Sequence, residues 1–140
     1  MHVNKTQVLC MDIHNFFPSI NINQVFEAFH CVGYTSDVAQ ALAQLCTHNA
    51  ILPQGAPTSP TLANIIFSPI DQQILNAIST KEITYTRYAD DLIFSSSHEL
   101  DFLIPLVSEI ISTNGFEINS NKTHLMKNPY RKMITGLIVT

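Results

Sequence analysis

A pair of acids lies between two runs of strand-forming residues in the second half of the chain. Asp90 and Asp91 follow the run ITYTRY and precede the run LIFSS, and only Ala89 separates them from the first run. Runs of β-branched and aromatic residues joined by a tight turn predict an antiparallel β-hairpin. We therefore expect two carboxylates at the tip of a hairpin, inside an antiparallel sheet.

Two helices are predicted in the first third of the chain. Apolar residues at helical spacing predict a helix over residues 24–32, with Asn23 as its N-cap and Gly33 as its stop. A second helix should follow Ser36. Its apolar positions are Val38, Leu42, Leu45 and Cys46.

Two further helices flank the hairpin. The proline-rich segment ILPQGAPTSP blocks regular structure up to Ser59, which is expected to cap a third helix with a kink at Pro69. Ser96 and Glu99 form a capping box that predicts a fourth helix through about Thr113.

The order of these elements predicts the fold class. A strand, helices, a hairpin and a helix are followed by the strand-forming segments FEI, THLMK and MITGLIVT. This order indicates an α+β fold with a split βαβ (ferredoxin-like) antiparallel sheet and helices on one face. No repeat, low-complexity tract or linker divides the chain, so residues 1–140 are expected to form a single domain.

A third acid should meet the hairpin in such a sheet. Asp12 ends the strand-forming run TQVLCMDI, and the first strand of a split βαβ sheet can lie beside the hairpin. Two carboxylates about 4 Å apart repel by roughly 4 kcal/mol at an effective dielectric near 20. Arg87 is the only basic residue beside these acids in the sequence, so a bound cation is expected, and hard carboxylate oxygens suit Mg²⁺. Taken singly, each acid is better explained as a turn residue or a strand-end cap.

The charge balance limits what the chain can bind by itself. Seven Lys and Arg against 11 Asp and Glu give a net charge of -4, so no broad basic field is available for a nucleic-acid backbone. Any nucleic acid must be held largely by something else.

Three cysteines without a CxxC pair indicate neither a disulfide framework nor a zinc site and favour a reducing cytoplasm. No apolar run approaches the roughly 18 residues of a membrane span.

Four stretches, in this order, resemble signatures of the reverse transcriptase palm. They are the first acid segment MDIHNFFPSI, the proline-glycine loop LPQGAPTSP, the YxDD turn YTRYADDLIFS and the segment GFEINSNKT with its lysine. The resemblance covers nearly the whole chain and implies an RNA-directed DNA polymerase palm with a C-terminal primer-grip-like hairpin. FFPSI and R-x-x-ITGLIV are most similar to bacterial retron-type enzymes, which make DNA from a structured RNA and in several cases serve in phage defence. Group II intron enzymes share much of the pattern.

The resemblance implies a two-metal active site. Asp12 and Asp90 would bind two Mg²⁺ ions, with Mn²⁺ as a substitute, and Asp91 would complete the carboxylate set. Lys122 matches a lysine beside the leaving pyrophosphate, although an ordinary surface lysine is nearly as good an interpretation. Tyr88 resembles the residue that contacts the primer end; the alternative is a half-buried strand tyrosine.

The resemblance also assigns residues to the deoxynucleotide and to the template and primer. Phe17 lies where the family places an aromatic ring beneath the sugar, which excludes a 2′-hydroxyl; core packing is the alternative. Gln54 and Gly55 match a loop that touches the nucleotide and template, or else form a plain turn. The nucleotide set is Ile13, Asn15, Phe16, Phe17, Gln54 and Gly55. The primer and template set is Tyr88, Gly136 and Leu137.

The family pattern normally includes fingers before the first acid and a thumb after the primer grip, and both are absent from these 140 residues. We therefore expect a palm fragment that acts in the bacterial cytoplasm when completed by those segments, an RNA template and a DNA or RNA primer. Two alternatives stay open. One is a truncated, inactive remnant or a module that binds RNA or protein without chemistry. The other is an RNA-templated RNA polymerase, which Phe17 and the YADD turn count against.

Overall fold

The computed structural model describes residues 2, 5–127, 132–134 and 137–139, and the chain divides into two compact units. The first unit comprises residues 1–14 and 70–140, and the second comprises residues 15–69. Each unit is described by itself. The expectation of a single domain stays a prediction.

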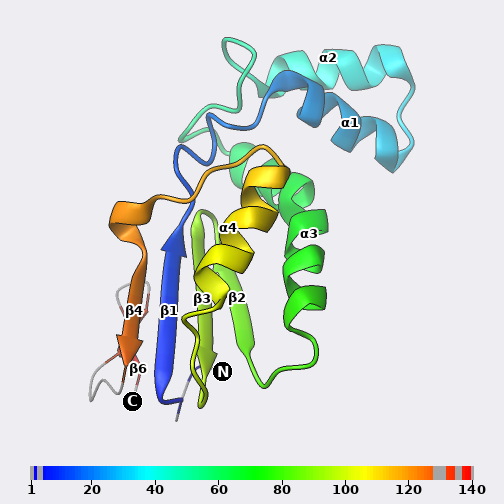
Figure 1. Ribbon diagram of the computed structural model, residues 1–140. Coiled ribbons are helices and arrows are strands. Elements are labelled where there is room, and N and C mark those ends of the chain that lie inside the picture. The colour runs from blue at the N-terminus through cyan, green and yellow to red at the C-terminus, as the bar shows by residue number, and fades with distance from the viewer. Residues whose placement is uncertain (1, 3–4, 128–131, 135–136, 140) are drawn as a thin grey trace. The chain divides into compact units, whose positions relative to one another are not determined.

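The first unit contains a four-stranded antiparallel sheet (Figure 1). Its strands lie in the order β2-β3-β1-β4, which is the strand order of a split βαβ fold, so the predicted fold class is confirmed. Two more strands, β5 and β6, pair antiparallel as a separate two-stranded sheet at the position of the expected C-terminal hairpin. The bounds are β1 Gln7–Asp12, β2 Thr84–Tyr88, β3 Asp91–Ser96, β4 His124–Lys127, β5 Lys132–Ile134 and β6 Leu137–Val139. The predicted strand FEI is reduced to one isolated bridge between Ile13 and Ile118.

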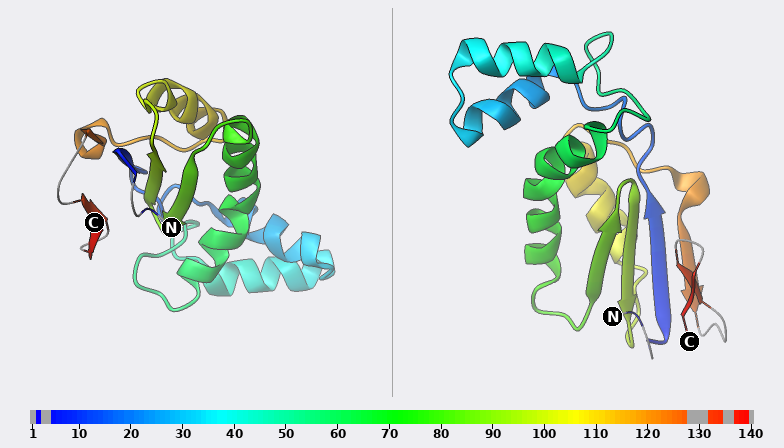
Figure 2. Two further views of the ribbon diagram at one scale, coloured as in Figure 1. Left: turned by 90° about the horizontal axis from the view of Figure 1, so that it is seen from below. Right: turned by 180° about the vertical axis from the view of Figure 1, so that it is seen from behind.

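One face of this sheet packs against two helices (Figures 1 and 2). They are α4 (Leu103–Thr113) and the C-terminal part of α3 (Ser59–Ile78), residues 70–78. Each helix buries a stripe of apolar residues spaced four apart, as expected for one helical face. The stripes are Ile70, Ile74 and Ile78 on α3 and Leu103, Val107 and Ile111 on α4, and the strand residues buried with them are Leu9, Met11, Leu92 and Phe94.

The alternate residues of the same strands point to the opposite face, because side chains alternate along a strand. This second face, which we call the open face, carries a small apolar cluster of Val8 and Ile93 with Cys10 and Met126 packed against it. Neither α3 nor α4 lies on it (Figure 2). The sheet therefore has one covered face, which holds the core of the unit, and one face with little apolar burial.

The fourth helix begins later than the capping-box prediction places it. Ser96 is the last residue of β3, and its hydroxyl donates to the Glu82 carbonyl at 3.0 Å instead of capping a helix. Helix α4 starts at Leu103, so Pro105 lies in its first turn, where the backbone N–H groups have no intrahelical partner and proline is tolerated. Helix α4 ends at Thr113, as predicted, and Gly115 follows it with φ +82°.

The second unit contains α1 (Ile22–Val32), α2 (Ser36–Cys46) and residues 59–69 of α3. The N-cap of α1 is Asn21 and not Asn23, because the Asn21 side chain forms a capping box with Gln24. The predicted stop at Gly33 is confirmed by its left-handed backbone, φ +112°.

The apolar face predicted for α2 is confirmed only in part. Leu42 and Cys46 are half-buried, but Val38 and Leu45 are 44% and 82% exposed, and the fully buried residues are Ala39 and Ala43. Close packing of α1 and α2 favours small residues at their contact, and hydrophobicity alone does not report this.

Helix α3 begins one residue earlier than predicted. Ser59 is its first residue, and its hydroxyl donates to the Pro53 carbonyl at 2.6 Å instead of capping the helix. Pro69, the site of the predicted kink, lies inside the helix, and the kink itself stays a prediction. Among the described residues, no helix is both long and apolar enough to cross a membrane.

Candidate active site

Three segments of the first unit meet at the C-terminal end of β1. Asp12 is the cross-strand partner of Asp91 at the start of β3. The next amide, Ile13 N–H, donates to the Asp90 carbonyl at 2.9 Å, and Asn119 N–H donates to the Asp12 carbonyl at 2.8 Å. Backbone hydrogen bonds therefore fix the acid-bearing end of β1 to the hairpin turn and to the segment before β4.

Asp12 and Asp91 point to the open face of the sheet. Directly opposite residues in an antiparallel pair share a face. Cys10 and Ile93 lie two residues from Asp12 and Asp91 along the same strands, so they share that face too, and both belong to the open-face cluster. Asp90 is in the turn itself. The predicted meeting of the first strand with the hairpin is therefore present, with Asp91 directly opposite Asp12.

Lys122 is the cation at this site. It ends the short 3-10 helix η1 (Ser120–Lys122), and its Nζ donates to Asp12 Oδ2 at 3.0 Å. The Asp12 side chain is only 10% exposed, whereas the Lys122 side chain is 62% exposed. The hydrogen bond and the negative charge of Asp12 raise the pKa of Lys122 above its usual value, so the ammonium form is favoured.

Burial and neighbouring like charges both disfavour the ionised form of Asp91. Burial raises the pKa of Asp91, and the negative charges of Asp90 and Asp12 raise it further, while Lys122 opposes the shift. Carboxylates placed directly opposite each other in a sheet destabilise it. The chain therefore concentrates negative charge where a bound cation would relieve repulsion.

Arg87 does not have the neutralising position that its sequence suggested. It pairs with Leu92 in the register of β2 and β3, so its side chain lies on the helix-covered face, opposite to Asp91. There it forms an ion pair with Asp71 of α3 at 2.8 Å. The alternation of side chains across the sheet separates Arg87 from the acids that neighbour it in sequence.

The carboxylates fit a metal ion whose coordination shell is completed by ligands from outside the protein. Across the described residues, no three His, Cys, Asp or Glu side chains are gathered so as to hold a metal ion by themselves. Asp12 and Asp91 nevertheless supply hard oxygens, and Mg²⁺ commonly takes one or two carboxylates and completes its shell with waters and substrate phosphates. The site is thus suited to a divalent ion that arrives together with a phosphate-bearing substrate.

A hollow of about 530 Å³ lies beside the acids on the open face. Its polar lining comes from Asp12, Asp91, Lys122 and His124, and the rest is apolar. The apolar lining residues are Cys10, Met11, Ile93 and Met126. A substrate at the acids would therefore contact both charged and apolar surface.

The other predicted residues of the first unit differ in exposure. Tyr88 ends β2, pairs with Asp91 and so shares the open face with it, and it is 75% exposed. The Ile13 side chain is buried at 1% exposure, and its amide is already bonded to Asp90. Gly136 lies outside the described residues, and Leu137 is the first residue of β6.

The remaining nucleotide residues belong to the second unit. Asn15 has a left-handed backbone with φ +47°. Phe16 is 3% exposed and packs edge-on against Phe17 and Phe67, with ring centroids 5.3 and 5.5 Å apart. Gln54 and Gly55 are exposed in a turn, where Gly55 has φ +89°. Phe16 therefore has a core role, and Phe17, which is only half-buried, has ring surface available.

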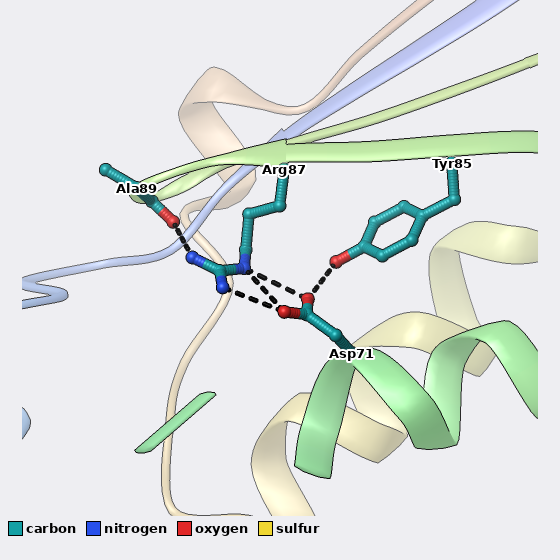
Figure 3. Close-up of polar contacts among 4 residues, drawn as sticks. All are labelled: Asp71, Tyr85, Arg87 and Ala89. Carbon is teal, nitrogen blue, oxygen red and sulfur yellow. Dashed lines mark hydrogen bonds and ion pairs between the residues drawn. The ribbon is translucent and has the colours of Figure 1, made fainter. Parts of the chain in front are cut away.

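Sequence reasoning missed a polar network on the covered face. Asp71, Tyr85 and Arg87 are joined by side-chain hydrogen bonds, and Arg87 also reaches the backbone of Ala89 (Figure 3). One signal could have revealed it, because Asp71 is the sole charged residue in the 20-residue helix α3. A lone charge in an otherwise apolar and amide-rich helix needs a partner if it is partly buried.

Comparison with known proteins gives consistent matches over the length of the chain. The family pattern described as "Reverse transcriptase (RNA-dependent DNA polymerase)" matches residues 2–137. The chain is 37% identical to the retron Ec86 reverse transcriptase of Escherichia coli and 32% identical to the retron Mx65 reverse transcriptase of Myxococcus xanthus, with 99% of the chain covered in each case. It spans 44% and 37% of the lengths of those two relatives.

The fold is similar to that of a solved polymerase structure. Apo telomerase from Candida tropicalis, truncated from its C-terminal domain, superposes with a TM-score of 0.69 over 96% of this chain and 34% of that protein, at 15% sequence identity. This likeness concerns the α+β palm-like fold alone. Because the family pattern covers nearly every residue, the chain belongs to the reverse transcriptase family.

Proposed function

We propose that this chain is the catalytic palm of an RNA-directed DNA polymerase of the retron type. It would transfer deoxynucleotides to a primer 3′-hydroxyl on an RNA template. The observation that carries the proposal is the placement of Asp12 opposite Asp91, with the Lys122 ammonium 3.0 Å from Asp12, on the open face of the sheet. Membership of the reverse transcriptase family supports it.

The acids would bind metal in this proposal. Asp12, Asp90 and Asp91 would hold two Mg²⁺ or Mn²⁺ ions, and the chemistry that these supply when bound is activation of the primer hydroxyl and stabilisation of the leaving oxygen. Backbone bonds to Ile13 and Asn119 hold the acid-bearing segments in place without using the carboxylates. The carboxylate oxygens therefore stay available for ligands other than Lys122.

Lys122 would act on the leaving group. Its side chain is flexible and 62% exposed, so the ammonium can turn from Asp12 towards a phosphate oxygen. There it would donate a proton or a hydrogen bond to the departing pyrophosphate. Before it turns, the contact with Asp12 raises the pKa of Lys122 and so favours the ammonium form.

The remaining residues would position the substrates. The half-buried ring of Phe17 would exclude a ribose 2′-hydroxyl, and the exposed Tyr88 ring would contact the primer end. Gln54 and Gly55 would touch the nucleotide and the template, and amides near Asn15 and Phe16 would meet the triphosphate. Ile13 would contribute through its backbone, because its side chain is buried, and Gly136 with Leu137 would contact the primer.

Other parts of a longer polypeptide would complete the enzyme. The chain spans less than half the length of its retron relatives and has a net charge of -4, so fingers and thumb segments would supply the basic surface that holds template and primer. A bacterial cytoplasmic location and a part in phage defence extend the proposal by likeness to retron enzymes.

The test is primer extension on an RNA template with Mg²⁺ and labelled deoxynucleotides, using the complete polypeptide that contains this chain. Asp90→Asn should lower the rate by roughly a hundredfold or more. Asp101→Asn is the matched control, because Asp101 is an exposed acid paired with Lys127 outside the site. A wild-type protein that binds template and primer without extending them would instead identify a binding module.

Phe17 allows a second arm of the same experiment. Phe17→Ala should admit ribonucleotides and so lower the selectivity for deoxynucleotides, because the ring that excludes the 2′-hydroxyl is removed. Phe16→Ala is the comparison, since Phe16 is a buried core residue and should affect folding instead of sugar choice. Unchanged selectivity in Phe17→Ala would assign Phe17 to packing as well.

A further inference from the structure

The carboxylate of Asp71 is the centre of a network on the covered face of the sheet (Figure 3). Arg87 Nη2 donates to Asp71 Oδ2 at 2.8 Å, and Arg87 Nε donates to Oδ1 and Oδ2 at 3.0 and 3.2 Å. Tyr85 Oη donates to Asp71 Oδ1 at 2.7 Å. The Asp71 carboxylate therefore receives donors from two residues of β2 and joins helix α3 to that strand.

Arg87 has a second contact that reaches the turn of the hairpin. Its Nη1 donates to the Ala89 carbonyl at 3.1 Å, so one guanidinium binds the helix carboxylate and the turn backbone together. The Arg87 side chain is 8% exposed, and a buried guanidinium has few alternative partners. Its planar fork fixes the directions of both sets of hydrogen bonds.

The turn that Arg87 contacts has a strained backbone. Ala89 has φ +51°, in the left-handed region that residues with a Cβ rarely adopt. Such conformations persist where surrounding contacts determine them, and they cluster at functional sites. Asp90 follows Ala89 directly, and Asp91 starts the next strand.

We propose that the Asp71–Arg87 pair is a positioning device that holds the Ala89–Asp90 turn in the conformation that presents the acids on the opposite face. Asp71 and Arg87 would touch neither the nucleotide nor the metal and would act through the turn. The proposal rests on the proposed function for its catalytic consequence, whereas its structural part concerns the turn alone.

Tyr85 has an auxiliary part in this device. Its ring stacks on Phe94 with centroids 4.9 Å apart, and burial together with the hydrogen bond to Asp71 raises its pKa well above the usual range. The phenol therefore stays a donor and helps to orient the Asp71 carboxylate. Tyr85→Phe removes this one donor and leaves the contact between Arg87 and Ala89, so it should have the mildest effect of the network variants.

Amide hydrogen exchange measures the stability of the Ala89–Asp90 turn independently of catalysis. The Ile13 amide donates to the Asp90 carbonyl, so it reports on the turn, whereas the Asn119 amide donates to Asp12 on the other side of β1 and serves as an internal reference. In the complete polypeptide, Arg87→Lys should speed exchange at Ile13 about tenfold and leave Asn119 unchanged, because an ammonium lacks the fixed fork. Asp71→Asn is the second variant, since it keeps the side-chain shape and weakens the pairing.

Kinetics test the catalytic consequence on the same variants. Arg87→Lys and Asp71→Asn should lower kcat in primer extension about tenfold with little change in KM for the deoxynucleotide, since the substrate contacts remain. Asp101→Asn, which removes an exposed ion pair with Lys127, should leave both values as in the wild type.

The possible outcomes separate the two proposals. Equal exchange rates at Ile13 in variant and wild type, or equal acceleration at Ile13 and Asn119, would overturn the positioning role. Selective acceleration at Ile13 with unchanged kcat would overturn its catalytic consequence. Selective acceleration in a protein whose wild type extends no primer would support the hold on the turn and overturn the polymerase assignment instead.

Discussion

The two faces of the sheet in the first unit differ in how their charged side chains are paired. On the covered face, Asp71 meets Arg87 in a bidentate pair with side-chain exposures of 23% and 8%, and Tyr85 adds a further donor. On the open face, Asp12 and Asp91 lie opposite each other, with Lys122 as the cation that contacts Asp12. Among the described side chains, the charges of the covered face are paired with one another, whereas the acids of the open face outnumber the cation that contacts them.

The largest expected effect comes from the open face. Asp12→Ala should abolish primer extension, with a loss of roughly a thousandfold, because it removes a carboxylate that we propose binds the metal ions. The free energy of unfolding should change by less than about 1 kcal/mol, since relief of repulsion offsets the lost contact with the exposed Lys122. Rate measurements and chemical denaturation check the two parts. A loss of activity that merely tracked a loss of stability would contradict the difference between the faces.

Removal of an acid from the covered face should mainly lower the stability of the fold. Asp71→Ala removes the carboxylate that pairs with the buried Arg87 guanidinium and should lower the free energy of unfolding by about 3 kcal/mol. Asp101→Ala breaks a pair whose side chains are 54% and 55% exposed, and should cost less than about 1 kcal/mol. Chemical denaturation of the two variants side by side is the measurement. Equal losses would show that burial does not distinguish these pairs.

Lys122 sharpens the comparison on the open face. Lys122→Gln should lower kcat about a hundredfold, as expected for a lost proton or hydrogen-bond donor at the leaving group, with little effect on unfolding. Lys127→Gln is the matched control, because Lys127 is another exposed lysine that pairs with an acid, outside the site. Single-turnover rates for both variants would decide whether Lys122 acts on the leaving group. Similar rates would make Lys122 an ordinary surface lysine.

The smallest expected effect is a pH dependence of stability at the far end of the open face. The buried His2 ring bonds the Ser95 and Thr86 hydroxyls at 2.7 and 2.8 Å, and burial lowers its pKa below the ordinary 6.5. The neutral ring is thus favoured in the folded state, so its stabilising contribution is complete above pH 6.5 and declines as the pH falls through the lowered pKa. Unfolding measured from pH 8 to 5 should show this slope, and His2→Gln should remove it. An identical slope in His2→Gln would assign the pH dependence to other groups.

The sequence predicted what depends on local pattern. The strand formers around Ala89-Asp90-Asp91 predicted the hairpin, and the strand before Asp12 predicted an acid at its end. Their meeting followed from the order of elements, since a split βαβ sheet places the first strand beside the hairpin. These features depend on side-chain type and element order, both of which are visible in one sequence.

What the sequence did not predict depends on register and on competing partners. Arg87 neighbours the acids along the chain, but its pairing with Leu92 turns it to the other face, and a register shift of one residue would reverse that. Ser96 resembles a helix cap, but the Glu82 carbonyl binds its hydroxyl. The side chain of Asp71 pairs with Arg87 of β2, which is 16 residues away in the sequence. Each of these outcomes is set by tertiary neighbours that a local pattern does not contain.

The bonds from Ile13 to Asp90 and from Asn119 to Asp12 are made by main-chain atoms alone. Replacing an acid by its amide leaves every one of those atoms in place, so the frame around the reacting groups should survive the loss of chemistry. Asn-substituted proteins should therefore be good traps, in which template, primer and nucleotide can be captured together before a bond is made.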